Sequence, residues 1–220
     1  MYDLHNNLLL TNSECDLRRF GFRKAGVVFA DKFEPEKFRA LKENSELELF
    51  SAVKINSNNP GQMRKAVEKF RNQVDVILVH TKDNATMRAV AESNQVDVIA
   101  HAFVDQTSAR EAAAHNVALE INLKDILAVY GMKRAVLLSK IRFNLNLARK
   151  YKTPMLLTTG ASELKDMRSA KQIIALAECI GFTHDEAKRA LNEVPAGIIE
   201  KSRAQKRGEE IMDGVRRVKR

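Results

Sequence analysis

Seven short apolar runs, separated by stretches with helical signals, are the feature that most restricts the fold of this chain. Most of them are rich in Val, Ile and Leu with few polar interruptions, a pattern typical of parallel strands covered on both faces. They lie at Tyr2–His5, Ala25–Ala30, Leu47–Ile55, Val74–Val79, Val96–Ala100, Val117–Ile121 and Pro154–Thr158. The alternation of strand and helix predicts a parallel sheet with right-handed crossover connections.

One hexapeptide, Asn-Gln-Val-Asp-Val-Ile, occurs twice in this pattern, at Asn72–Ile77 and at Asn94–Ile99. Each copy begins one predicted unit of strand, short loop and helix. The identity does not establish duplication, because Val/Ile-rich strands can converge on the same six residues. The repeat therefore supports the alternation without adding a separate domain.

Helix signals fill the intervals between the runs. Pro35 fits the first turn of one helix, and Asn59-Pro60 opens another. The longest predicted helix covers Lys133–Lys150, and its buried stripe follows helical spacing at Leu137, Ile141, Leu145 and Ala148. A last compact helix is expected to end before Pro195, with Ile198 and Ile199 anchoring the start of a tail.

The number of strands favours a closed (β/α) barrel of the TIM type with about seven parallel strands, although an open doubly wound sheet stays possible. No Gly-x-Gly-x-x-Gly and no Walker loop follows a strand, which removes the main support for dinucleotide or P-loop binding. We expect a single barrel domain at residues 1–200. Residues 201–220 are expected to form a basic C-terminal tail, helical or partly disordered.

The charge of the chain favours a polyanionic partner. Its 220 residues carry a net charge of +9. Residues 201–220 hold eight Lys or Arg against three Asp or Glu, so the tail supplies more than half of the excess. There is no apolar run long enough to cross a bilayer and no secretory signal. With only Cys15 and Cys179, a reducing cytoplasm is the simpler expectation, without a disulfide.

Polar side chains are expected at the carboxyl ends of the strands, where barrels and open sheets place their functional groups. A metal site there would draw on Asp3, His5, His80, His101 and Glu120. The spacing gives poor support, because the chain has no His-x-His, no His-Glu-x-x-His and no Cys pair. Each histidine is therefore interpreted first as a hydrogen-bonded residue of the barrel end, and we expect no catalytic residue and no metal ligand.

Basic residues in the loops and helices around the sheet are the better candidates for binding. The stretch Lys165–Lys171 follows the last predicted strand and leads into a helix, so its cations and the helix N-terminus could meet a phosphate together. Aromatic residues make up only 6% of the chain. Contact with an RNA backbone is therefore favoured over base stacking.

The chain also resembles a known family, the archaeal ribonuclease P protein component 3 family, the counterpart of the eukaryotic thirty-kilodalton subunit. The similarity extends over most of residues 1–200 and rests on an ordered set of segments rather than on one motif. The segments are Tyr2–His5, Ala118–Asn122, Asn144–Tyr151, Pro154–Ala161, Met167–Ser169, Ile173–Gly181 and Glu186–Leu191.

This resemblance implies a TIM-barrel-like fold related to the polymerase-and-histidinol-phosphatase group of metal-dependent phosphoesterases. Those enzymes open with His-x-His, whereas this chain has Asp3-Leu4-His5, which fits a barrel without the metal chemistry. In the family the catalyst is an RNA that removes the 5′ leader of precursor tRNA. The implied partners are that RNA, precursor tRNA indirectly, a small RRM-like subunit and other ribonuclease P proteins, with no membrane.

The resulting prediction is a protein subunit of the endoribonuclease P complex that is not catalytic alone and binds no cofactor itself. Mg²⁺ acts through the RNA, and cations of the protein reduce repulsion between phosphates. The expected RNA contacts are Arg88, Arg110, His115, Lys124, Arg142, Lys165 and Arg168. Two alternatives stay open: a metal-dependent phosphoesterase built on the five polar residues at the strand ends, and a barrel enzyme acting on a small anionic metabolite in a deep pocket.

Overall fold

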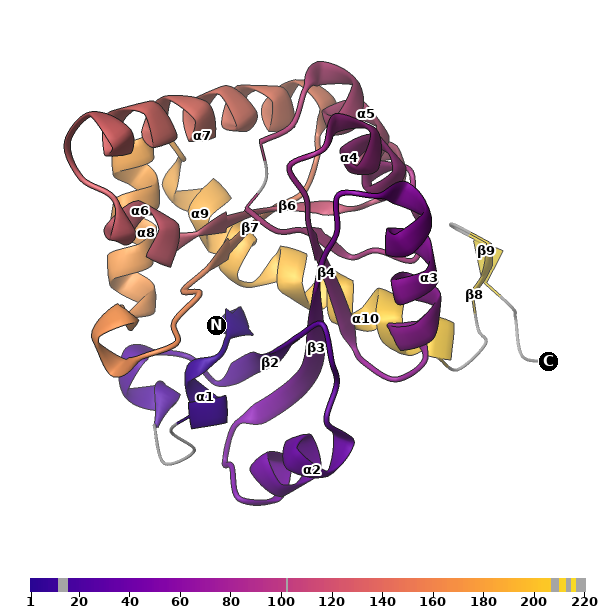
Figure 1. The fold of residues 1–220 in the computed structure, drawn as a ribbon. Helices are drawn as coiled ribbons and strands as arrows, with labels where there is room; N and C mark the ends of the chain where they lie inside the picture. Colours follow the sequence, from indigo (N-terminus) through magenta and orange to yellow (C-terminus); the bar gives the residue numbers. More distant parts are fainter. Residues whose placement is uncertain (12–15, 102, 207–209, 213–214, 217–220) are drawn as a thin grey trace.

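The computed structural model describes residues 1–11, 16–101, 103–206, 210–212 and 215–216. Seven parallel strands follow one another in the sheet in chain order (Figure 1). They are β1 (Tyr2–Asn6), β2 (Lys24–Ala30), β3 (Glu48–Asn56), β4 (Val76–His80), β5 (Val98–Ile99), β6 (Ala118–Asn122) and β7 (Met155–Thr158). Each predicted strand overlaps an observed one, so the seven-stranded expectation is confirmed.

The sheet closes into a nearly complete barrel where the carboxyl ends of β7 and β1 meet. The Gly160 N–H donates to the His5 carbonyl at 3.0 Å, and the Asn7 N–H donates to the Ala161 carbonyl at 2.8 Å. Gly160 has φ +61°, and a Cβ on it would lie 2.0 Å from the side-chain oxygen of Asn122. Both the backbone conformation and the lack of space therefore require glycine at the point of closure. The barrel, rather than the open sheet, is the observed fold.

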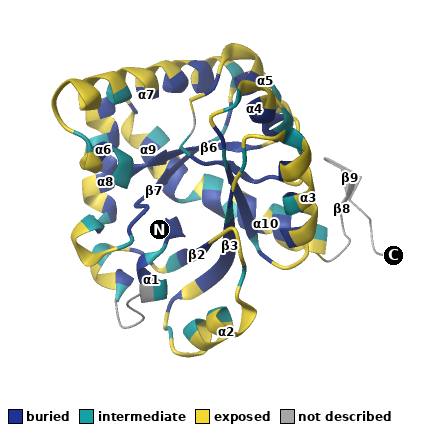
Figure 2. Ribbon diagram, in the orientation of Figure 1, coloured by how far each residue is buried: buried dark blue, intermediate teal, exposed yellow. Residues whose placement is uncertain are grey.

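Helices cover the outside of the barrel and bury their apolar stripes against it (Figures 1 and 2). The α-helices are α1 (Leu8–Thr11), α2 (Pro35–Glu43), α3 (Pro60–Arg71), α4 (Asn84–Ala91), α5 (Gln106–Ala114), α6 (Leu123–Ala128), α7 (Gly131–Tyr151), α8 (Ala170–Ile180), α9 (His184–Leu191) and α10 (Glu193–Lys206). Two 3₁₀ turns, η1 (Leu17–Phe20) and η2 (Leu164–Asp166), and a short antiparallel pair, β8 (Glu210–Met212) and β9 (Val215–Arg216), complete the described elements. None of the described helices is both long and apolar enough to span a membrane.

A second, smaller core fills the inside of the barrel. Leu4, Val28, Phe50 and Leu78 point inward, and Ile198 and Ile199 of α10 pack against this cluster. The Arg71 guanidinium, at the end of α3, connects α10 to the start of β5. It donates to Asp97 at 2.7 Å and to the Ser202 hydroxyl at 2.9 Å. Helix α10 therefore packs across the amino ends of the strands and belongs to the barrel.

The sequence prediction was wrong about this last helix. We expected Pro195 to end α9 and Ile198-Ile199 to anchor a tail, but Pro195 lies in the first turn of α10, where a missing N–H has no helical partner to lose. The helix continues to Lys206 with Ser202 and Ala204 buried, so the division expected after residue 200 falls inside it. Cys15 and most of residues 207–220 lie outside the described residues.

The closure of the barrel leads to a stability prediction with an internal control. Gly160→Ala should lower the free energy of unfolding by about 2 kcal/mol or more, because it combines left-handed strain with a clash at Asn122. Gly197→Ala, inside α10 and with open space around the new methyl group, should instead raise stability by about 0.5–1 kcal/mol. Urea unfolding of the full chain measures both, and equal effects of the two substitutions would contradict the role of Gly160 in closure.

Candidate functional site

The carboxyl ends of the strands bring polar side chains from opposite ends of the sequence together. Asp3 and His5 come from β1, Glu120 from β6 and Thr158 from β7, and all four are buried. This rim is where a parallel barrel places its functional groups. The expectation that the strand ends would gather these residues is correct.

Glu120 is the centre of this polar network. Its carboxylate accepts from the His5 ring at 2.6 Å and from the Thr158 hydroxyl at 2.6 Å. Burial alone would raise the pKa of Glu120, but the neighbouring His5 charge and its hydrogen bond outweigh burial and hold the pKa at about 2. Glu120 is therefore an acceptor that stays ionised and ties β1, β6 and β7 together.

Asp3 is used in the same structural way. It accepts from the Thr159 N–H at 3.0 Å, from the Thr159 hydroxyl at 2.5 Å and from the Asn6 amide at 2.9 Å. Burial raises the pKa of Asp3 above its usual value, and these hydrogen bonds oppose that rise. Asp3 stands where a His-x-His motif would have its first histidine. Its carboxylate thus bonds to Thr159, directly after β7, and so joins β1 to the last strand of the barrel.

His101 and His80 lie beside this network and are only partly covered. The His101 ring pairs with Asp125, and it stands edge-on to the His80 ring with 5.0 Å between the centroids. Burial lowers the pKa of His101, but its hydrogen bond with Asp125 and the charge of Glu120 give a net rise. Burial lowers the pKa of His80. The two rings therefore favour opposite charge states at the same rim.

These residues do not assemble a metal-ligand set. In the part of the chain that the structure describes, no group of three His, Cys, Asp or Glu side chains is placed to hold a metal ion. The reason is visible in the geometry: the oxygens of Asp3 and Glu120 accept from neighbouring side chains and backbone. The hydrogen-bonded interpretation of the rim therefore has direct geometric support, whereas the phosphoesterase alternative gains none.

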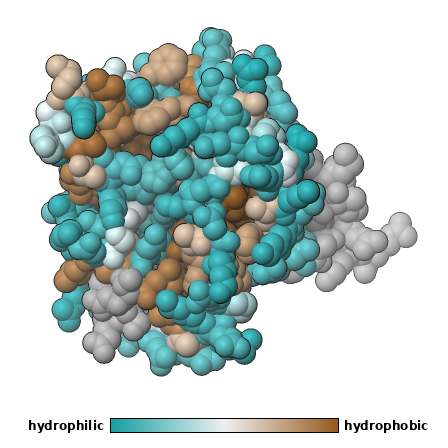
Figure 3. Space-filling view, in the orientation of Figure 1, coloured by the Kyte–Doolittle hydropathy of each residue, from teal (hydrophilic) through white to brown (hydrophobic). Residues whose placement is uncertain are grey.

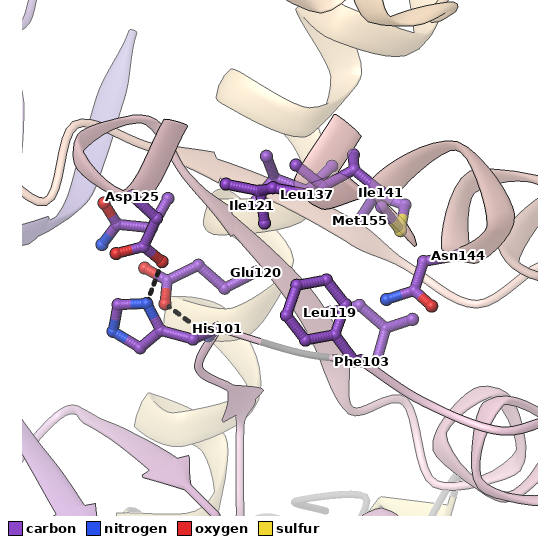
Figure 4. Close-up of a pocket in the computed structure, with 11 residues that line it drawn as sticks. His101, Phe103, Leu119, Glu120, Ile121, Asp125, Leu137, Ile141, Asn144 and Met155 are labelled. Carbon is purple, nitrogen blue, oxygen red and sulfur yellow. Dashed lines mark hydrogen bonds and ion pairs between the residues drawn. The ribbon is translucent and has the colours of Figure 1, made fainter. Parts of the chain in front are cut away.

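A small cavity opens next to the rim, between β6 and α7 (Figure 4). Its volume is about 20 Å³, room for about one water molecule. His101, Glu120 and Asp125 form its polar end, and Leu137, Ile141 and Met155 form its apolar end. A cavity of this size at the rim is too small for the deep substrate pocket that the small-metabolite alternative would place there. A larger cavity, of about 480 Å³, lies away from the rim, beside Thr153 and Pro154 at the amino end of β7.

The predicted RNA-binding residues do not form one continuous patch. Lys124, Lys165 and Arg168 lie on the connections that follow β6 and β7, at the carboxyl end of the barrel. Lys124 pairs with Asp166 at 2.9 Å and Lys165 with Glu163 at 2.8 Å, whereas one guanidinium nitrogen of Arg168 donates to the Lys165 and Met167 carbonyls. These three cations form the group closest to the rim.

The other four candidates lie on the helical shell. Arg88 of α4 pairs with Asp105 at 3.5 Å, and Arg110 of α5 pairs with Glu111 at 3.0 Å. His115 follows α5, and its ring nitrogen lies 2.9 Å from the Glu111 carbonyl oxygen. Arg142 of α7 donates to the Ile180 carbonyl at 2.9 Å and so caps the C-terminus of α8. The structure thus separates the seven residues into a rim group and a shell group.

Two positions with structural importance were missed from the sequence. Arg71 was given no role from the sequence, yet it is buried and bonded to Asp97 and Ser202. Asn122 was expected only at the end of a strand, without a role of its own, yet its side chain occupies the space over Gly160 and caps α6 by accepting from the Lys124 N–H at 3.0 Å. The Asn122-Leu123-Lys124 sequence does carry a capping signal, since Asn is a preferred first residue of a helix.

Comparison with known proteins gives a consistent picture across nearly the whole chain. The family model described as RNase P subunit p30 matches residues 11–207. The ribonuclease P protein component 3 of Methanosarcina acetivorans is 35% identical over 209 residues, covering 90% of this chain and 87% of that protein. The protein of the same description from Methanothermobacter thermautotrophicus is 36% identical over 197 residues, covering 84% and 80%.

A solved structure agrees with these sequences. A chain in the cryo-EM structure of archaeal ribonuclease P with mature tRNA superimposes with a TM-score of 0.81 at 25% identity, covering 100% of this chain and 97% of that one. The molecule is therefore a (β/α)-barrel protein of the kind found in protein components of ribonuclease P. It belongs to the RNase P subunit p30 family.

The depressed pKa of Glu120 predicts an acid-dependent loss of stability. The folded-state pKa of about 2 lies below the ordinary value of 4.5, so Glu120 stabilises the fold above about pH 4.5, and this stabilisation is lost as the pH falls toward 2. The full difference is at most about 3 kcal/mol. Denaturant unfolding of wild type and Glu120→Gln between pH 7 and pH 2.5 measures it. The stability gap should narrow with acid, and a gap that is constant with pH would contradict the pKa assignment.

Proposed function

We propose that this protein is a subunit of ribonuclease P that binds the catalytic RNA and supports removal of the 5′ leader from precursor tRNA. The observation that carries the proposal is the full-length match to a chain of archaeal ribonuclease P, together with the family membership. The protein supplies a rigid barrel and positive charge, and the bond-breaking step belongs to the RNA. Mg²⁺ acts within that RNA, and the protein itself holds no cofactor in this proposal.

The finer parts of the proposal concern partners and contacts. A small RRM-like subunit and other ribonuclease P proteins are its proposed protein partners, and precursor tRNA is reached indirectly, in the cytoplasm. The RNA contacts proposed are those of the rim group and the shell group defined above. The ion pairs of Arg88, Arg110 and Lys165 have exposed side chains, so their carboxylates stabilise little and a phosphate can replace them.

Reconstitution tests the functional proposal directly. Adding the full-length protein and its companion subunits to the matching RNA should allow precursor-tRNA cleavage at a Mg²⁺ concentration where the RNA alone is inactive. The physical reason is that protein cations lower the repulsion that Mg²⁺ otherwise has to screen. Cleavage that is indifferent to this protein, or phosphodiester hydrolysis by the protein without RNA, would overturn the proposal.

Salt dependence of RNA affinity tests individual residues. Arg110→Ala, Lys124→Ala and Arg168→Ala should each weaken binding and reduce the slope of log K against log salt by roughly 0.7–0.9, as expected for one lost phosphate contact. Lys24→Ala is the matched control, because Lys24 pairs with Glu48 at the amino end of the barrel. Slopes identical to wild type in all three variants would remove these residues from the RNA interface.

A further inference from the structure

Helix α7 carries apolar residues on two opposite faces. The first face packs on the core and is the stripe expected from the sequence: Leu137, Ile141, Leu145 and Ala148. The second consists of Met132, Val136 and Phe143, which at about 100° per residue fall within about 40° of one another and point away from Ile141. An apolar stripe on the side opposite the core is expected where a second surface covers the helix.

This second face is open to solvent in the free chain. Tyr130, just before the helix, is 83% exposed, Met132 78%, Phe143 57% and Val136 49%. Of the seven large hydrophobic side chains that are exposed among the described residues, six lie in or beside α6 and α7: Phe103, Leu127, Tyr130, Met132, Val136 and Phe143. Figure 3 shows apolar side chains gathered at the upper left of the view, where Figure 1 places α6 and the first turns of α7. We call the six residues the α7 face.

The first half of α7 has no buried side chain. Every residue from 131 to 140 is exposed or half-buried, in contrast to the second half, which contributes five buried residues (Figure 2). Helices in proteins derive most of their stability from packing an apolar face against other elements. Nearly three turns without a buried side chain, with Met132 and Val136 one turn apart on the same face, thus form an uncovered contact surface rather than a scatter of single apolar residues.

The charge of helix α7 itself has a single sign. The 21 residues of α7 include six Lys or Arg and no Asp or Glu. Lys133 and Lys140, which flank the exposed stripe, form no ion pair with a carboxylate of the described residues, and the Lys140 ammonium lies over the Phe103 ring, 5.0 Å from its centroid. Two cations without a counter-charge among the described residues therefore border the apolar stripe.

Apolar residues with a basic border select among three possible occupants. A second copy of this chain, paired through the same face, would bring the Lys133 and Lys140 ammonium groups of the two copies together, which costs affinity. An RNA backbone would satisfy the cations but would leave Met132, Val136 and Leu127 facing phosphates and ribose. A protein surface with an apolar centre and an acidic border satisfies both features.

We propose that the α7 face binds another protein subunit of ribonuclease P, through an apolar patch on that subunit bordered by Asp and Glu. This inference rests on the proposed function, because it takes the partner from the same particle. Tyr130, Met132 and Phe143 fill the centre of the contact, where large exposed side chains contribute most to affinity. Lys133 and Lys140 meet the acidic border and speed association.

The test measures binding of the full-length protein to the companion protein subunits without RNA. Val136→Asp combined with Phe143→Asp should raise the dissociation constant about tenfold or more, because it puts charge into an apolar contact centre and repels the acidic border. Lys133→Glu with Lys140→Glu should weaken binding at low salt, with the difference from wild type shrinking as salt is raised. The folded state should be unaffected, since the substituted side chains are largely exposed.

Leu164→Asp is the matched control, because Leu164 is the seventh exposed hydrophobic residue, 57% exposed in η2 and outside the α7 face. It should bind the companion subunits within about twofold of wild type. Three results overturn the proposal: unchanged protein binding by the Val136/Phe143 double variant, loss of affinity for the RNA alone with protein binding intact, or a wild-type dimer in sedimentation that the double variant converts to monomer.

Cleavage assays separate this inference from the functional proposal. If wild type supports cleavage at low Mg²⁺ and the double variant binds and supports it equally well, the α7 assignment fails and the proposed function stands. If wild type neither associates with the companion subunits nor supports cleavage, both fail. The expected result is a wild type that supports cleavage and a double variant that requires a higher protein concentration for the same rate.

Discussion

The closure between β7 and β1 is the interaction on which the rest of the molecule depends. It is made by a few polar contacts: Asp3 with Thr159, the His5 carbonyl with Gly160, and Glu120 bridging His5 and Thr158. A seven-stranded parallel sheet without them would have two exposed edges, each a row of unpaired backbone groups. The residues that an enzyme of this architecture would devote to chemistry are here committed to holding the first and last strands together.

Helix α10 covers the amino end of the same barrel. The strands enclose an apolar interior whose amino end must be covered, and Ile198 and Ile199 cover it. The helix is held in place by hydrogen bonds to different elements: Arg71 to Ser202, Arg203 to Glu48, and Lys206 to Asp75. Much of the positive charge in this helix is thus engaged with the barrel, so a basic tail in the sequence is not the same thing as a free basic surface.

The spacing of apolar residues along the chain predicted the strands and helices whose structure depends on nearby residues. The seven strands and the core-facing stripe of α7 follow from apolar periodicity and were found in place. Helix α10 was missed because a proline shortly after a helix is typical both of the segment that ends that helix and of the first turn of a new helix, and Pro195 is the second case. The exposed stripe of α7 was missed because apolar residues on both faces obscure the period that a single stripe would show. The burial of Arg71 depends on Ser202, 131 positions away, so nothing near it in the chain signals that contact.

The cations show why ion pairing within the chain does not settle which residues bind RNA. The pair between Arg71 and Asp97 is buried, and removing either partner leaves a charge in the interior, so no external phosphate can compete for that arginine. The pairs of Arg88, Arg110 and Lys165 are largely exposed to water. Their net stabilisation is about 0–1 kcal/mol, and a backbone phosphate offers the same kind of hydrogen bonds with an equal negative charge. Burial therefore determines which positive charges can bind an RNA. Only the folded structure distinguishes a buried, paired cation from an exposed cation whose carboxylate partner a phosphate can replace.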